Sequence, residues 1–204
     1  MKLYKNLKQA LKEREQVEAL KITIKEKDFP QEILNFTNLK ELYLESSCQD
    51  FPRAMPSWQS LRIVSFKLPD FTGDLSDLLS LPQLENLKII ETPLKSFLLP
   101  LGHAKAPLKS LTIKDCELER LPEELSMLNR LIEMNLSGNK LSALPVSMVD
   151  LKQLKRLNLD GNHFEQFPDI IKRMPHLAHL SIDHNKFDDE ERARIQREYN
   201  ISPN

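Results

Sequence analysis

The sequence has few of the residues that usually make turns and cross-links. Only 4 of its 204 residues are glycine, whereas 13 are proline. Glycine adopts left-handed backbone conformations most easily, so most turns here must be built from other residues. The chain also has only 2 cysteines and 1 tryptophan. A small domain stapled by several disulfides is therefore excluded.

Neither sign of charge dominates, and no long apolar run is present. The chain has 29 Lys and Arg against 30 Asp and Glu, a formal net charge of −1. No whole-protein field therefore attracts nucleic acid or an anionic membrane, and we expect neither partner. No apolar stretch approaches the roughly 18 residues that a membrane-spanning helix needs, so we predict no membrane insertion.

The N-terminal stretch alternates charged and apolar residues and lacks the continuous apolar centre of a signal peptide. As written, the chain is therefore expected in the cytoplasm. If a signal had been removed before residue 1, the protein would instead be secreted or lie at a cell surface.

What the sequence does contain is an internal repeat. The pattern apolar-x-x-apolar-x-apolar starts eight times, at intervals of 22 to 24 residues. Its first residues are Val17, Leu39, Leu61, Leu84, Leu108, Leu131, Leu154 and Leu177. Such a constant interval indicates a solenoid in which each unit buries its apolar face against its neighbours.

The later units carry a more specific motif. In "LIEMNLSGNKLSALP" (131–145) the apolar residues are followed by Asn139, and Asn162 and Asn185 hold the same place in the next two units. This pattern resembles the leucine-rich repeat, L-x-x-L-x-L-x-x-N/C-x-L, over roughly residues 17–187. The spacing in "LPEELSMLNRL" is similar to that of the LP-containing repeats of bacterial and intracellular members. Four units have neither Asn nor Cys at the place of Asn139, and have Lys25, Ser47, Pro69 and Thr92 instead.

The resemblance implies an α/β fold, a leucine-rich-repeat solenoid curved like a horseshoe. A parallel β-sheet would form its concave face, and short helical or irregular turns its convex face. We expect an N-terminal capping helix in 1–16, eight repeats in 17–187, and a C-terminal capping helix and tail in 188–204. Residues 2–14 would form the first helix. Asp188 would cap the second, with Glu191 at the reciprocal capping position.

The two cysteines are expected to be free thiols. Cys48 and Cys116 lie three repeats apart, and stacked strands are about 4.8 Å apart, which separates them by roughly 14 Å. A disulfide requires Cα atoms within about 7 Å of each other.

The tract "HLAHLSIDH" contains residue types that serve in catalysis and metal binding. His179, Ser181 and Asp183 alternate along a predicted strand, where residues i and i+2 are about 6.6 Å apart. That distance is too long for the hydrogen bonds of a catalytic triad. A metal site made by His179, Asp183, His184 and Asp160 is an alternative, but its ligands would converge poorly from a flat sheet. We therefore predict solvated polar residues, and no catalytic residue, metal or cofactor.

The concave face displays apolar side chains within a charged rim in the first four repeats. We predict a partner-binding site made by Lys21, Tyr43, Glu45, Ile63, Lys67, Leu68, Lys88 and Ile90. Apolar and aromatic anchors inside a charged rim are typical of a protein-binding hot spot. The alternative is that these degenerate repeats have an irregular register and that the apolar residues belong to the core. The sequence leaves both open.

The resulting functional hypothesis is a monomeric, non-enzymatic module that binds a protein partner of unknown identity through its concave face. It rests on the resemblance, and a fold does not fix a function. One alternative is the substrate-recognition part of an enzyme system, such as a bacterial leucine-rich-repeat effector. Another is a structural or self-associating protein.

Overall fold

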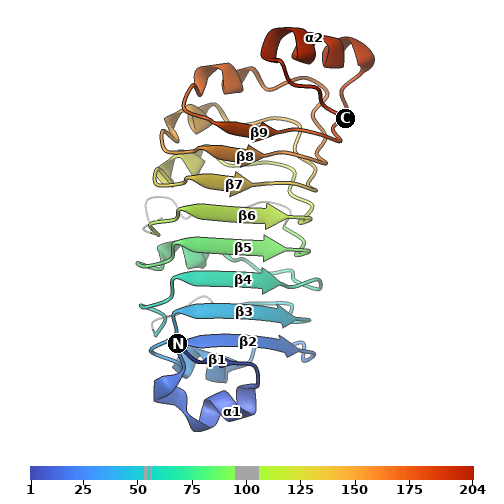
Figure 1. Cartoon of the computed structure of the whole chain (residues 1–204). Helices are drawn as coiled ribbons and strands as arrows, with labels where there is room; N and C mark the ends of the chain where they lie inside the picture. Colours follow the sequence, from blue (N-terminus) through green and yellow to red (C-terminus); the bar gives the residue numbers. More distant parts are fainter. Residues whose placement is uncertain (53–54, 56, 95–105) are drawn as a thin grey trace.

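The computed structural model describes residues 1–52, 55, 57–94 and 106–204. Within these residues the chain forms one sheet of nine parallel strands in chain order. Figure 1 shows the strands stacked from the N-terminal to the C-terminal end. The strands are β1 (Leu3–Tyr4), β2 (Ala19–Ile24), β3 (Glu41–Ser46), β4 (Ile63–Lys67), β5 (Asn86–Ile90), β6 (Ser110–Lys114), β7 (Glu133–Asn135), β8 (Arg156–Asn158) and β9 (His179–Ser181). The expected α/β solenoid is confirmed.

Short helical segments carry the chain back between strands. The α-helices are α1 (Leu7–Lys12) and α2 (Asp189–Tyr199), and 3-10 helices cover Arg14–Gln16, Gln31–Asn35, Ser76–Ser80, Glu123–Met127, Val146–Asp150 and Asp169–Arg173. A proline immediately precedes four of the 3-10 helices, namely Pro30, Pro122, Pro145 and Pro168. Proline fixes its own φ and lacks an N–H, so it suits a helix start. Proline therefore marks the turns that a glycine-poor chain must make.

The strands share one register, which places equivalent leucines in a single core. Leu20, Leu42, Val64, Leu87, Leu111, Met134, Leu157 and Leu180 are successive partners across β2–β9. All but Leu180 are at most 2% exposed. Residues on either side of them along each strand face the opposite way.

The strands of the first three repeats end differently from those of repeats four to eight. In repeats four to eight, the eighth residue of the unit has a positive φ, between 46° and 68°: Glu91, Asp115, Gly138, Gly161 and His184. In the first three repeats, Ile24, Ser46 and Leu68 have no positive φ. Their in–out alternation therefore continues for one more residue. Leu68, which we predicted to be exposed, is 0% exposed and belongs to the core, so that prediction is wrong.

The asparagine column closes the later turns. Asn162 Nδ2 donates to the carbonyls of Leu136 (2.9 Å) and Leu159 (3.0 Å), and its Oδ1 accepts from Leu141 N–H (3.0 Å). Further toward the N-terminus, Thr92 takes over part of this role. Its Oγ1 accepts from Leu68 N–H and donates to Ile90 C=O, both at 2.9 Å. The turn that contains Pro69 is thus closed by the hydroxyl of the next repeat.

The N-terminal helix is shorter than predicted. Residues Leu3–Tyr4 form β1, which pairs with β2, and α1 begins only after Asn6. The Asn6 Oδ1 accepts from Gln9 N–H at 3.1 Å and caps the helix. Strand pairing satisfies backbone groups at the edge of β2, and this tertiary gain outweighs helix propensity. Leu3 is consequently 43% exposed rather than packed on the core.

The C-terminal helix is capped by Asp188, as predicted. Its Oδ1 accepts from Glu191 N–H at 2.8 Å. The reciprocal bond that we predicted for Glu191 is replaced by a tertiary one, because its Oε1 accepts from Phe167 N–H at 2.7 Å. Ile195 is 0% exposed, and Tyr199 stacks on Phe167 with ring centroids 4.1 Å apart. No helix in the described ranges is long and apolar enough to cross a membrane.

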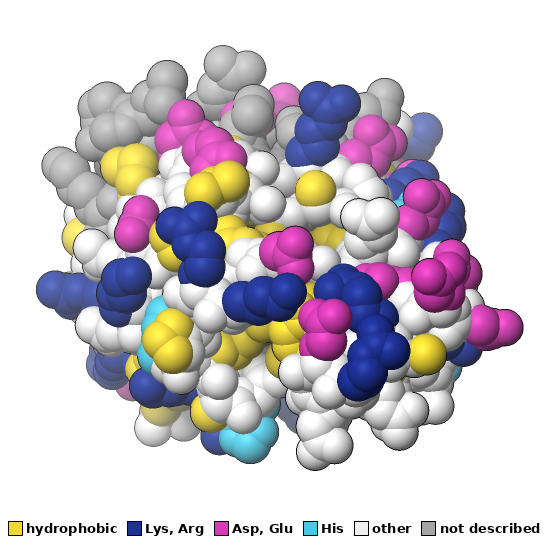
Figure 2. Space-filling view, turned by 90° about the horizontal axis from the view of Figure 1, so that it is seen from above, with side chains coloured by type: hydrophobic (Ala, Val, Ile, Leu, Met, Phe, Trp, Pro, Cys, Tyr) yellow, Lys and Arg dark blue, Asp and Glu magenta, His cyan; other side chains and the backbone are white. Residues whose placement is uncertain are grey.

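The end of the solenoid at β9 is only partly covered. Leu177 and Leu180 are half-buried there, whereas the equivalent Leu154 and Leu157 are at most 1% exposed. A hollow of about 410 Å³ lies beside them, lined also by Met174 and Tyr199. Figure 2, which looks onto the molecule from above Figure 1, shows hydrophobic side chains gathered between charged ones.

Candidate functional site

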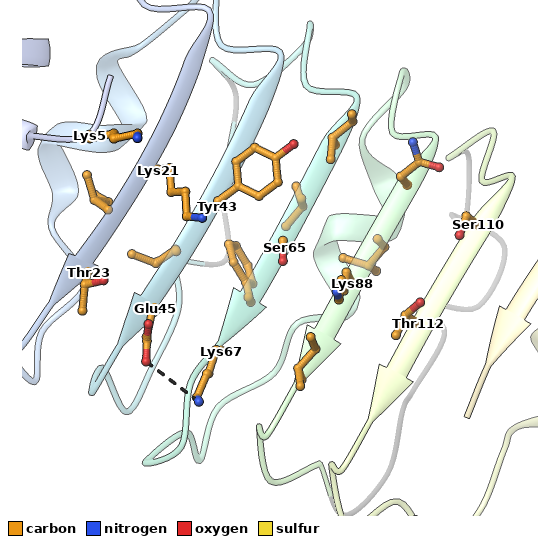
Figure 3. A pocket seen from close by; sticks show the side chains of 18 residues that line it. Lys5, Lys21, Thr23, Tyr43, Glu45, Ser65, Lys67, Lys88, Ser110 and Thr112 are labelled. Atoms are coloured by element: carbon orange, nitrogen blue, oxygen red, sulfur yellow. Dashed lines mark ion pairs between the residues drawn. The ribbon is translucent and has the colours of Figure 1, made fainter. Parts of the chain in front are cut away.

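A groove of about 770 Å³ lies on the concave face over β2–β6. Its lining includes seven of the eight predicted site residues: Lys21, Tyr43, Glu45, Ile63, Lys67, Lys88 and Ile90. Figure 3 shows five of them, Lys21, Tyr43, Glu45, Lys67 and Lys88, on adjacent strands. Leu68 is buried and does not line the groove. The concave groove, as we call it below, is thus the place where the predicted residues meet.

The strand register explains why these residues share one surface. Lys21, Tyr43, Ser65, Lys88 and Thr112 are successive partners across β2–β6, and together they form the central row of the groove. Residues two positions before or after them along the strands face the same way and form two flanking rows. Within these rows Tyr43, Ile63 and Ile90 are half-buried, so each leaves part of its side chain open to the groove. For these three residues, the alternative that they are core is wrong.

The charges along one rim of the groove are already paired. Lys67 Nζ lies 2.7 Å from Glu91 Oε2 and 3.9 Å from Glu45 Oε1. The hydrogen bond to Glu91 raises the pKa of Lys67, so the ammonium stays charged. Tyr43 donates its hydroxyl to Glu41 at 3.1 Å, and its pKa is raised first by burial and then by Glu41. The hydrogen bond to Glu41 therefore restrains the position of the Tyr43 hydroxyl.

Three lysines on the groove are not paired in this way. Lys5, Lys21 and Lys88 line the groove and are exposed, and none has an ion pair among the described residues. Lys5 was missed by the sequence analysis, because residues 2–14 were assigned to a helix. It follows directly after β1 and lies beside Lys21 (Figure 3). Two residues of strand are too short to show a detectable alternation in the sequence.

A second hollow of about 340 Å³ covers the concave face over β6–β9 and is lined by polar residues such as Asn135, Asn158 and Ser181. Ser181 Oγ donates to both carboxylate oxygens of Asp160, at 2.7 and 2.8 Å. Asp160 Oδ1 also accepts from Asp183 N–H at 2.8 Å. Ser181 is thus bound to the preceding repeat and not to His179, which excludes the triad geometry.

The metal alternative has no geometric support in the part of the chain that the structure describes. No group of three or more His, Cys, Asp or Glu side chains there is arranged to hold a metal ion. Asp160 is instead engaged with Ser181 and with the backbone of its neighbouring turn. His179 lies on β9, whereas Asp183 and His184 lie in the turn that follows it.

Both cysteines are free thiols, as predicted, and both are buried. Cys116 Sγ donates to Lys114 C=O at 3.0 Å and fills the place that asparagine holds in later repeats. Burial raises the pKa of the Cys116 thiol to about 11. Because only a thiolate is strongly nucleophilic, this thiol is a structural element of the ladder.

Comparison with known proteins agrees with this geometry. Residues 106–164 match the leucine rich repeat family. A leucine-rich-repeat protein of Leptospira interrogans has the same fold, with a TM-score of 0.68 and 21% identity over 93% of this chain and 66% of that one. InlP of Listeria monocytogenes is similar with a TM-score of 0.64 and 18% identity, over 90% of this chain and 55% of that one. Residues 106–164 thus carry the leucine rich repeat motif, and the chain as a whole has the leucine-rich-repeat fold.

The leucine-rich-repeat fold also relates it to a longer plant protein. The ectodomain of the Arabidopsis thaliana receptor kinase GASSHO1/SCHENGEN3, in complex with CASPARIAN STRIP INTEGRITY FACTOR 2, has a TM-score of 0.58 at 20% identity. The similarity covers 82% of this chain and 20% of that one. The chain thus spans only part of the length of each of these relatives. No curated protein matches its sequence.

Proposed function

We propose that this leucine-rich-repeat protein is a non-enzymatic module that binds a protein partner in its concave groove. The observation that carries the proposal is the combination in one groove of half-buried Tyr43, Ile63 and Ile90 with exposed Lys21 and Lys88. Aromatic and aliphatic anchors with a polar rim are the features of a binding hot spot.

The groove is the better candidate of the two concave surfaces. The hollow over β6–β9 is smaller, and its polar groups, such as Ser181, are already hydrogen-bonded to protein. Polar groups that are satisfied internally gain little from a partner. The receptor kinase ectodomain named above is in complex with CASPARIAN STRIP INTEGRITY FACTOR 2, which supports a binding role for a similar fold.

The proposal is tested by capturing the partner from the native setting and measuring its affinity for variants. In Tyr43→Ala/Ile63→Asp, the aromatic anchor is lost and a charge enters the apolar patch. We expect at least a tenfold loss of affinity, because a hot-spot residue contributes about 2 kcal/mol or more. Both side chains are half-buried on the sheet surface, so the fold should persist, which circular dichroism checks.

His179→Ala is the matched control, since His179 is exposed on the same sheet but outside the groove. Its affinity should equal that of the wild type. An unchanged affinity of the folded double variant would reject the groove as the binding site.

A further inference from the structure

The central row of the concave face carries positive charge and no negative charge. Continued in register in both directions, it runs Lys5, Lys21, Tyr43, Ser65, Lys88, Thr112, Asn135, Asn158 and Ser181. The row therefore contains three lysines and no carboxylate. The acidic residues near the groove, such as Glu45 and Glu91, belong to a flanking row or to the turn and are used by Lys67.

Four other lysines near the sheet form ion pairs with glutamates of a neighbouring repeat. Such pairs join Lys40 to Glu18, Lys67 to Glu91, Lys109 to Glu85, and Lys140 to Glu117. Lys5, Lys21 and Lys88 have no such partner in the described ranges. Lys5, which follows β1, even lies beside Lys21 of β2 (Figure 3), an arrangement that costs stability because like charges repel. The positive charges of the row are thus not neutralised within the described residues, and a negatively charged ligand would pair with them.

The spacing of the lysines defines the shape of that ligand. Lys21 and Lys88 are three strands apart, which corresponds to about 14 Å at about 4.8 Å per strand. In an extended peptide, residues i and i+4 are about 13 Å apart and point to the same side. A peptide that crosses the strands along the central row can therefore place one acidic side chain on each lysine.

The residue between the two acids would meet the apolar part of the groove. In an extended peptide, residue i+2 points to the same side as i and i+4. Midway between Lys21 and Lys88 lie Tyr43 and Ser65 of the central row, with Ile63 beside them. Tyr43 and Ile63 are half-buried and line the groove, so an apolar side chain at i+2 would cover them.

From these distances we propose that the groove binds an extended acidic segment of a partner protein with the pattern acid-x-apolar-x-acid. The segment crosses the strands, with its acids on Lys21 and Lys88 and its apolar residue on Tyr43 and Ile63. Lys5 adds positive potential next to Lys21. The inference rests on the proposed function and specifies the ligand of the same groove.

The test uses the full chain and three dye-labelled peptides in a fluorescence anisotropy titration. The first is Ser-Glu-Thr-Leu-Thr-Glu-Ser, which has the inferred spacing. The second, Ser-Gln-Thr-Leu-Thr-Gln-Ser, lacks the charges. The third, Ser-Glu-Thr-Leu-Glu-Thr-Ser, has the same composition with one glutamate displaced to the other side of the strand. We expect the first peptide to bind at least fivefold more tightly than the uncharged one, which loses two ion pairs, and at least twofold more tightly than the displaced one, which loses one.

Variants of the protein test which lysines are involved. Lys21→Gln and Lys88→Gln should each weaken the first peptide about 2- to 5-fold, as expected for partly exposed ion pairs, and should reduce the dependence of its affinity on salt. Lys27→Gln is the matched control, because Lys27 is exposed in the same repeat but does not line the groove. It should bind as the wild type does.

The outcomes separate this inference from the proposed function. If the first peptide does not bind, or binds no better than the uncharged or displaced one, the acidic segment is rejected. The same holds if Lys27→Gln weakens binding as much as Lys21→Gln. If Tyr43→Ala/Ile63→Asp then still loses the captured partner, the groove stands as the binding site and only the ligand chemistry is wrong. If neither set of variants affects the captured partner, both proposals fail.

Discussion

At the eighth residue of each unit, a single backbone torsion decides whether the strand stops or continues. A left-handed residue ends the alternation in repeats four to eight, but only two of the five are glycine, Gly138 and Gly161. Glu91, Asp115 and His184 adopt the same conformation at some cost in strain, because their Cβ atoms crowd the backbone. The near absence of glycine is thus accommodated by strained turns as well as by proline.

The two glycines should respond differently to alanine. Gly161 has φ +61° and ordinary contacts of 3.5 Å around an added Cβ, so Gly161→Ala should cost only the left-handed strain of about 1 kcal/mol. A Cβ on Gly138 would lie 1.8 Å from Asp115 Oδ1. Gly138→Ala also forces the exposed Asp115 side chain to rotate away, so it should be more destabilising than Gly161→Ala in urea denaturation.

The Asp115 side chain is the source of that difference, and a double-variant cycle isolates it. In an Asp115→Ala background, the effect of Gly138→Ala should fall to that of Gly161→Ala. A cost for Gly138→Ala that is the same in both backgrounds would contradict this account.

At the scale of single residues, the sequence predicted which side chains line the groove better than it predicted which belong to the core. The eight-fold repeat gave the register, and the register alone brought Tyr43, Ile63 and Ile90 onto one surface. Leu68 was misplaced because the consensus turn was assumed at a position where the strand continues inward. Pro69, in the place of the asparagine, was the available signal, since a turn without an amide ladder need not begin at the same residue.

At the scale of elements, the carboxylate of Glu191 connects helix α2 to the seventh repeat. Glu191 accepts from Phe167 N–H in the seventh repeat and pairs with Arg194 in its own helix, at 2.6 Å. Its hydrogen bonds with Arg194 lower its pKa, as does the Phe167 N–H, whereas burial opposes this. The helix is therefore joined to the repeats by a charged group.

Replacing this carboxylate should loosen α2 in a pH-dependent way. A lowered pKa in the folded state means that the charge stabilises the protein above the ordinary value of 4.5, and that this stabilisation is lost as the pH falls. Glu191→Gln should cost about 1–3 kcal/mol at pH 7 and less at about pH 3. Urea denaturation and hydrogen exchange of the α2 amides at both pH values measure the effect.

Glu198→Gln provides the control for this experiment. Glu198 also pairs with Arg194, at 3.1 Å, but its side chain is 38% exposed. Its removal should cost less than about 0.5 kcal/mol at pH 7. Equal effects of the two substitutions would show that the link to Phe167 contributes nothing.

The ends of the chain were harder to predict than the repeats. Asp188 was identified as a cap because capping depends on local sequence. The partner of Glu191 and the pairing of β1 depend on residues far away in sequence or on a sheet edge, and local patterns do not contain them. Repeat periodicity therefore predicts the middle of a solenoid well and its ends poorly.

At the scale of the whole molecule, each unit contacts mainly its neighbours, and the end units need cover. We propose the division into an N-terminal cap (1–16), eight repeats (17–187) and a C-terminal cap with tail (188–204). Ala10 of α1 and Ile195 of α2 are 0% exposed, which supports covering roles for both segments. The hollow beside Leu180 shows that the second cover is incomplete.

We expect the protein to remain monomeric despite this partly open end. β9 has only three residues, and short edge strands disfavour the addition of another strand. The tail also returns to this edge, where His184 N–H donates to Asn204 C=O at 2.8 Å. Light scattering coupled to size exclusion should give a mass near 23.7 kDa at all concentrations. A dimer mass that rises with concentration would instead favour self-association through the β9 end.

The asparagine column affects where repeats can be added to the solenoid or removed from it. Asn139, Asn162 and Asn185 each donate to the carbonyl three residues earlier and to one in the preceding repeat, and each accepts from the N–H 21 residues earlier. The hydrogen bonds that connect neighbouring repeats are therefore equivalent at all three asparagines. We therefore expect that one such unit can be duplicated or deleted in frame, because the cut ends would form the same hydrogen bonds again. Repeats one to four have Lys25, Ser47, Pro69 and Thr92 at this place, so we expect such changes of length in the C-terminal half and outside the groove.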